Sequence, residues 1–207
     1  MDELTFAAPA GVCRGWRDGE VIRATGLRYA RAERYAPPTP EPDTEQVDAT
    51  EWAPACPQEQ AERERDLIGP ILDEIGQDED CQRLSITRPV ELSGPLPVMV
   101  WIHGGSYISG AGDAPVYDPA LIVGEQNVVA VNLTYRLGRL GFLGGPDGPP
   151  ANLGLLDIQE ALRWIQRNIA AFGGDPTNVT LYGESAGADA IAHLMIAEGS
   201  TGLFHKA

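Results

Sequence analysis

A serine between two glycines stands where an apolar strand pattern gives way to a helical one. The segment "NVTLYGESAGADAIAHLM" passes through Gly183, Ser185 and Gly187 and then continues with helical spacing of its apolar residues. A GxSxG pentapeptide also occurs by chance in ordinary loops. A sharp turn from strand to helix, however, lifts a serine Oγ clear of the sheet, where it can attack a carbonyl carbon. Because strand, turn and helix are all present, we interpret Ser185 as a nucleophile.

A second glycine-rich segment follows another buried strand pattern. In "VMVWIHGGSYISGAG" the residues Gly104 and Gly105 come directly after the strand, where backbone amides without neighbouring Cβ atoms can approach a reacting oxygen. A flexible loop or a phosphate cradle would be the alternatives, but a phosphate loop needs a lysine directly after its last glycine, and none follows Gly110. We therefore expect Gly104, Gly105 and Ala186 to donate their N–H groups to an oxyanion.

None of the three histidines fits the base that a serine nucleophile needs. His193 lies eight residues along the same predicted helix, or about 12 Å at ~1.5 Å per residue, which is too far for a hydrogen bond to Ser185. His103 belongs to the glycine-rich loop, and His205 is followed by only two residues. The sequence thus predicts a nucleophile and an oxyanion hole without their general base.

The elements that must position these residues follow an α/β pattern. Apolar strand signals occupy residues 96–102, 127–135 and 178–182, and a long amphipathic helix is predicted over 154–172. Continuous apolar strands are typical of a mostly parallel sheet covered by helices on both faces. We predict that residues 84–207 form this sheet core.

The N-terminal part has a different composition. Residues 1–83 combine short strand signals with Gly, Pro and acidic loops, and Asp18 and Gly19 predict a hairpin turn. One helix is predicted over residues 57–76, interrupted at Gly69 and Pro70. We expect this antiparallel, loop-rich segment and the core to belong to one domain.

Charge and composition restrict the partners. Thirty acidic and fifteen basic side chains give a formal charge of −15, which disfavours nucleic acid and anionic membranes and leaves a small-molecule substrate as the expected partner.

No apolar run approaches the ~18 residues of a membrane span, and the acidic N-terminus lacks a signal pattern, so a cytoplasmic location is the default expectation. Cys13, Cys56 and Cys81 lack the CxxC spacing of a metal site, and no cofactor is expected.

Several segments resemble the type B carboxylesterases and cholinesterases of the α/β-hydrolase superfamily. The resemblance covers most of the chain, and its most specific part is the long block that ends in GESAG. The segments that carry it are "GLRYARAERYAPP", "ACPQ", "DEDC", "VMVWIHGGSY", "VNLTYRLGRLGFL", "NLGLLDIQEALRWIQRNIAAFGGDPTNVTLYGESAGA" and "GLFHKA".

The resemblance implies an α/β-hydrolase fold and an esterase activity on small-molecule esters, with Ser185 as the nucleophile. It also implies two ion pairs, Arg34 with Glu79 and Arg136 with Asp157, for which ordinary surface charges are the alternative. Cys56 and Cys81 match a disulfide of extracellular relatives, and a reduced pair is equally consistent with the sequence.

Two features set this chain apart from the family. Arg28, Gln82 and Ser85 replace a proline, an apolar residue and an amide of the usual motifs. The catalytic acid and histidine of the family lie in a second half, so the resemblance implies that the sheet is truncated after the nucleophile helix and that the C-terminal half of the same domain is missing. A non-catalytic binding or adhesion protein, or an inactive gene fragment, remains the alternative to a serine esterase.

Overall fold

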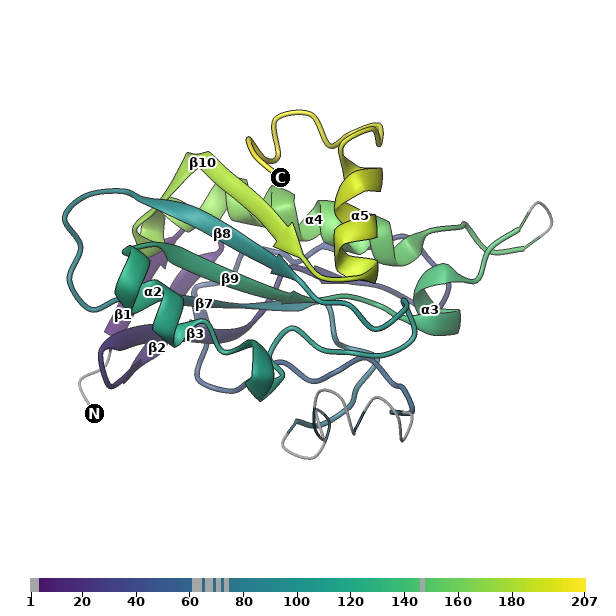
Figure 1. The fold of residues 1–207 in the computed structure, drawn as a ribbon, viewed down its shortest axis with the longest axis horizontal. Helices are drawn as coiled ribbons and strands as arrows, with labels where there is room; N and C mark the ends of the chain where they lie inside the picture. The colour runs from purple at the N-terminus through teal and green to yellow at the C-terminus, as the bar shows by residue number, and fades with distance from the viewer. Residues whose placement is uncertain (1–3, 61–64, 66–68, 70–71, 73–74, 146–147) are drawn as a thin grey trace.

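The computed structural model describes residues 4–60, 65, 69, 72, 75–145 and 148–207. A twisted sheet runs the length of the molecule, with helices on both sides (Figure 1). The helix predicted over residues 57–76 falls largely outside the described residues. The strands are β1 Leu4–Ala8, β2 Gly11–Asp18, β3 Val21–Arg28, β4 Ala30–Arg31, β5 Thr39–Pro40, β6 Gln46–Asp48, β7 Arg83–Pro89, β8 Leu96–Ile102, β9 Val129–Thr134 and β10 Gly174–Gly183.

The sheet is mixed, and its parallel part carries the predicted functional residues. Its main path runs in the order β1-β2-β3-β7-β9-β8-β10, with β6 paired to β2. Neighbours from β1 to β9 are antiparallel, and the predicted turn at Asp18 and Gly19 joins β2 to β3. β9, β8 and β10 are parallel to one another, as their continuous apolar sequences predicted.

Successive side chains of a strand point to opposite faces of the sheet, and different helices cover the two faces. Val98, Val100 and Ile102 of β8 belong to the main core with the helix α4, whereas Met99 of the same strand packs with Val123 of α2. α5 packs on β10 and β8 and also contacts α4 (Figure 1). The helices are α2 Ala120–Gln126, α3 Gly138–Phe142, α4 Leu153–Asn168 and α5 Ala186–Leu194.

A buried ion pair holds α4 against the chain that leaves β9. Arg136 donates from Nε and Nη2 to the two carboxylate oxygens of Asp157, at 2.8 and 2.7 Å, and its backbone N–H also binds Asp157. Gln82, one of the departures from the family motif, adds its amide at 3.0 Å from Asp157 Oδ1. Both members of the predicted Arg136–Asp157 pair are therefore buried and fully partnered.

The other predicted pair and the cysteines have different surroundings. Arg34 and Glu79 do form the predicted ion pair, but on the surface. Cys56 and Cys81 are both buried and free in the structure, and Cys56 Sγ accepts the N–H of Leu137 at 3.2 Å. Among the described helices, none combines the length and the apolar character that crossing a membrane requires.

Removal of the Asp157 carboxylate should strongly destabilise the fold. In the full natural polypeptide, Asp157→Ala leaves the Arg136 guanidinium buried without its partner, and we expect a loss of about 3–5 kcal/mol in the free energy of unfolding measured with urea. Glu79→Ala, which breaks the exposed pair with Arg34, is the matched control and should change the unfolding midpoint little. Equal effects of the two substitutions would contradict this interpretation.

Candidate active site

The parallel register of β10 on β8 brings the two predicted motifs to one edge of the sheet. Gly183, the last residue of β10, lies opposite Ile102, the last residue of β8. The loops that follow the two strands therefore begin side by side. A Cβ atom on Gly187 would lie 2.0 Å from the carbonyl oxygen of Ile102, so only glycine allows the turn after β10 to approach β8 this closely.

Ser185 stands at the tip of this turn in a strained conformation. Its φ of 54° and ψ of −120° lie outside the regions that non-glycine residues prefer, and it occupies the N-cap of α5 without using its side chain as a cap. Ser185 is exposed, and its hydroxyl makes no hydrogen bond within the described residues. The backbone thus presents the Oγ to the outside of the sheet, as the GxSxG pattern predicted.

Gly104 lies directly beside Ser185. A Cβ atom on Gly104 would be 3.2 Å from the Cβ of Ser185 and 2.7 Å from the carbonyl oxygen of Glu184. Within the described part of the chain, the backbone N–H groups of Gly104, Gly105 and Ala186 donate to no protein acceptor. Free N–H groups next to a serine hydroxyl can receive the negative oxygen of a tetrahedral intermediate.

Contacts that the sequence did not reveal hold the glycine-rich loop in place. Gln58 binds both sides of Gly110, accepting its N–H at 2.6 Å and donating to its carbonyl at 2.7 Å. Tyr107 donates its hydroxyl to Asp189 of α5 at 2.6 Å. The loop is therefore tied directly to the helix that begins after Ser185. These partners are 52 and 82 residues apart in the sequence, so no local pattern joins them.

His103 is a structural residue of the loop. Its ring is fully buried, stacks on Tyr135 at 4.5 Å between centroids, and places Nδ1 2.8 Å from the carbonyl oxygen of Gly104. Since the carbonyl is an acceptor, Nδ1 must carry the proton. Burial lowers the pKa of His103 to about 4, so the ring is neutral at pH 7.

The other two histidines are engaged elsewhere. His193 is exposed on α5, with Nε2 3.5 Å from the Asp189 carboxylate. Nδ1 of His205 accepts the N–H of Val179, and the backbone around His205 and Lys206 pairs with the outer edge of β10. Val179 lies four residues before the end of β10, about 13 Å from its tip at ~3.3 Å per residue. No described histidine is hydrogen-bonded to Ser185.

The sheet order, the flanking helices and the strained serine after β10 define an α/β-hydrolase fold. A solved structure of a thermophilic PNB esterase superposes on the chain with a TM-score of 0.90 at 39% identity, covering 99% of this chain and 43% of that one. The chain belongs to the carboxylesterase family, whose sequence profile matches residues 7–207.

Curated relatives agree with this assignment. The chain is 42% identical over 206 residues to the para-nitrobenzyl esterase of Bacillus subtilis (strain 168), covering 95% of this chain and 41% of the relative. It is 41% identical over 206 residues to the probable N-octanoylanthranilate hydrolase AqdA2 of Rhodococcus erythropolis, covering 98% and 45%. The chain spans less than half the length of each of these relatives.

The buried neutral His103 predicts a specific loss of stability in acid. Its folded pKa of about 4 is below the ordinary value of 6.5, so the unfolded chain binds more protons and stability falls as pH drops from 6.5 towards 4. Between pH 6.5 and 4.5 the imidazole alone should remove about 2 kcal/mol. His103→Asn retains an N–H donor for Gly104 but does not titrate.

Urea unfolding at the two pH values checks this expectation. The full natural polypeptide should lose about 2 kcal/mol more than the His103→Asn variant over this interval, with the carboxylates common to both proteins cancelling in the difference. An identical pH dependence of the two proteins would show that His103 is not held neutral by burial.

Proposed function

We propose that this chain carries the nucleophile and the oxyanion hole of a serine hydrolase acting on carboxylic esters. The observation that carries the proposal is the position of Gly104 against Ser185 where β8 and β10 end, together with three backbone N–H groups that donate to no acceptor among the described residues. Ser185 is the proposed nucleophile, and Gly104, Gly105 and Ala186 are the proposed oxyanion donors.

The proposed reaction passes through an acyl-enzyme. Ser185 Oγ attacks the ester carbonyl carbon while a base removes the hydroxyl proton, and the former carbonyl oxygen becomes an oxyanion that accepts hydrogen bonds from the three amides. Collapse of this intermediate expels the alcohol, which takes up the proton, and leaves the acyl group on Ser185. Water then attacks the acyl carbon, the acyl group leaves as a carboxylic acid, and the Oγ of Ser185 regains its proton.

The general base is proposed to lie beyond residue 207. His103 is buried in the loop, His193 faces Asp189, and His205 is bound to β10, so none of them is placed to accept the proton of Ser185. The relatives are hydrolases more than twice as long as this chain, and their names describe action on a para-nitrobenzyl ester and on N-octanoylanthranilate. The first of these compounds is an ester and the second is an N-acyl amide, and the carboxylesterase family to which the chain belongs favours the ester as substrate class.

Replacing the nucleophile tests the proposal. In the full natural polypeptide, Ser185→Ala should lower the kcat for p-nitrophenyl butyrate by roughly 10⁴-fold or more, because the proposed acyl-enzyme forms on the Oγ of Ser185. Circular dichroism should show an unchanged fold. Ser93→Ala, on an exposed loop, is the matched control and should keep full activity. Hydrolysis by the folded Ser185→Ala protein at the parent rate would remove Ser185 from the mechanism.

Residues 1–207 by themselves should be inactive and poorly soluble. Within the described residues, the outer edge of β10 pairs only with residues 205–206, and Met195 and Ile196 expose large apolar side chains nearby in the sequence. Open strand edges and apolar surface promote association. Without a base, Ser185 of this polypeptide should not react with a fluorophosphonate probe. Labelling of Ser185 in a soluble, monomeric 207-residue product would contradict both expectations.

A further inference from the structure

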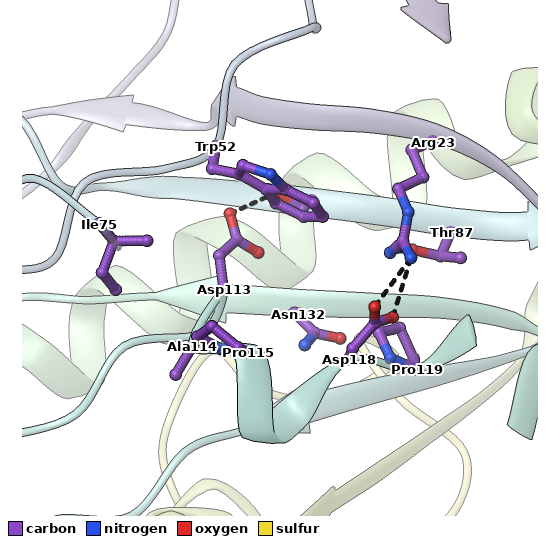
Figure 2. Close-up of a pocket in the computed structure, with 11 residues that line it drawn as sticks. Arg23, Trp52, Ile75, Thr87, Asp113, Ala114, Pro115, Asp118, Pro119 and Asn132 are labelled. Carbon is purple, nitrogen blue, oxygen red and sulfur yellow. Dashed lines mark hydrogen bonds and ion pairs between the residues drawn. The ribbon is translucent and has the colours of Figure 1, made fainter. Parts of the chain in front are cut away.

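A cavity lined by both polar and apolar side chains lies on the α2 face of the sheet, away from Ser185. Its volume is ≈190 Å³, slightly more than the ~150 Å³ of an engineered cavity that binds benzene. Figure 2 shows Asp113, Asn132 and Asp118 around it, together with the indole of Trp52. No residue of the 103–109 loop or of the turn at 184–186 lines this cavity. It is therefore separate from the proposed active site.

The floor of the cavity is a polar patch on a covered sheet face. Asn132 of β9 lies opposite Ser85 of β7, and Thr87 of β7 lies opposite Arg23 of β3. All four side chains are buried, whereas their strand neighbours on the other face, such as Ile86, belong to the main apolar core. Ser85 is one of the departures from the family motif, so this patch is partly a feature of this chain.

Two oxygen atoms of the cavity residues are left without donors. Asn132 is 4% exposed, and its Nδ2 donates to the carbonyl oxygens of Gly112 and Tyr117, which fixes the amide and leaves Oδ1 without a partner. Asp113 accepts the Ser85 hydroxyl at 2.6 Å and the Ala53 N–H at 2.9 Å, both on Oδ2. Its Oδ1 accepts no hydrogen bond within the described residues.

The charge around these oxygens is negative. Arg23 is already paired with Asp18 at 2.8 Å and with Asp118 at 2.9 Å, and its guanidinium lies over the ring of Trp52. Among the described residues no cation is paired with Asp113, so this region holds three carboxylates and one guanidinium, which is already paired with the other two. Burial raises the pKa of Asp113 to about 6, an effect that a bound cation would oppose.

We propose that this cavity binds a small protonated amine with an apolar body about the size of one aromatic ring. The ammonium group donates to Oδ1 of Asp113 and to Oδ1 of Asn132, the two acceptors that lack donors. The apolar body contacts Trp52, Pro115 and Pro119. An anionic ligand is disfavoured because Arg23 is fully engaged. A metal ion is also disfavoured, since no cluster of three or more His, Cys, Asp or Glu side chains suited to a metal occurs in the described part of the chain.

Benzylamine and its neutral isostere benzyl alcohol test this site by titration calorimetry at pH 7.5 on the full natural polypeptide. We expect benzylamine to bind at millimolar concentration or below, and benzyl alcohol to bind about tenfold more weakly or worse, because a hydrogen bond to a charged group is lost. Asp113→Asn should weaken benzylamine binding by the same factor. The variant amide keeps an acceptor for Ser85 and Ala53 but presents N–H groups to the cavity.

The Asp113→Asn protein is expected to fold, because the raised pKa of Asp113 means that its ionised form is less favourable in the folded protein than in the unfolded chain, and a neutral amide avoids that cost. Trp52→Ala, at a side chain that is 43% exposed, provides a second variant that removes the apolar wall and should also weaken binding. Absence of benzylamine binding up to 10 mM (about −2.7 kcal/mol) would overturn the proposal. Equal binding by both variants and the parent, or equal binding of the alcohol and the amine, would overturn it too.

Discussion

The register between β8 and β10 is the constraint on which the site depends. Gly183 and Ile102 are partners at the ends of two parallel strands, so the loops that follow these strands begin side by side. A shift of one residue would turn Val179 and Leu181 out of the core and move the turn away from β8. The same apolar contacts that stabilise the sheet therefore set the distance between Gly104 and Ser185.

The strained backbone of Ser185 must be held by its neighbours, and contacts on both sides of the turn hold it. Gly187 lets the turn close onto the carbonyl of Ile102, while Tyr107 connects the glycine-rich loop to Asp189 on the helix. Below them, the buried pair of Arg136 and Asp157 fixes α4, on which α5 packs. A φ of 54° at a serine persists only where neighbouring contacts determine the backbone this completely.

The local elements could be predicted from the sequence, but the long-range contacts could not. Apolar runs and amphipathic spacing gave β8, β9, β10 and α4, because burial on one or both faces leaves a direct trace in composition. The motifs also placed Gly104 and Ser185 at strand ends. By contrast, the bonds of Gln58 to Gly110 and of Tyr107 to Asp189 join distant segments and follow no periodicity. The antiparallel β7 is polar on one face, so its sequence lacks the continuous apolar run that marks β8 and β9.

That polar face links the departures from the family motif to a physical role. Along β7 and β9 the residues alternate strictly: Ile86 and Val131 belong to the apolar core, whereas Ser85 and Asn132 face away from it. Such side chains are costly to bury unless each finds a partner. Ser85 does, through Asp113, but the amide oxygen of Asn132 does not. The carbonyl oxygens of Gly112 and Tyr117 account for the Nδ2 of Asn132, so packing explains half of this amide. Its Oδ1 lines the same ring-sized cavity as Asp113 and has no donor, and a ligand that donates to both residues would remove this cost.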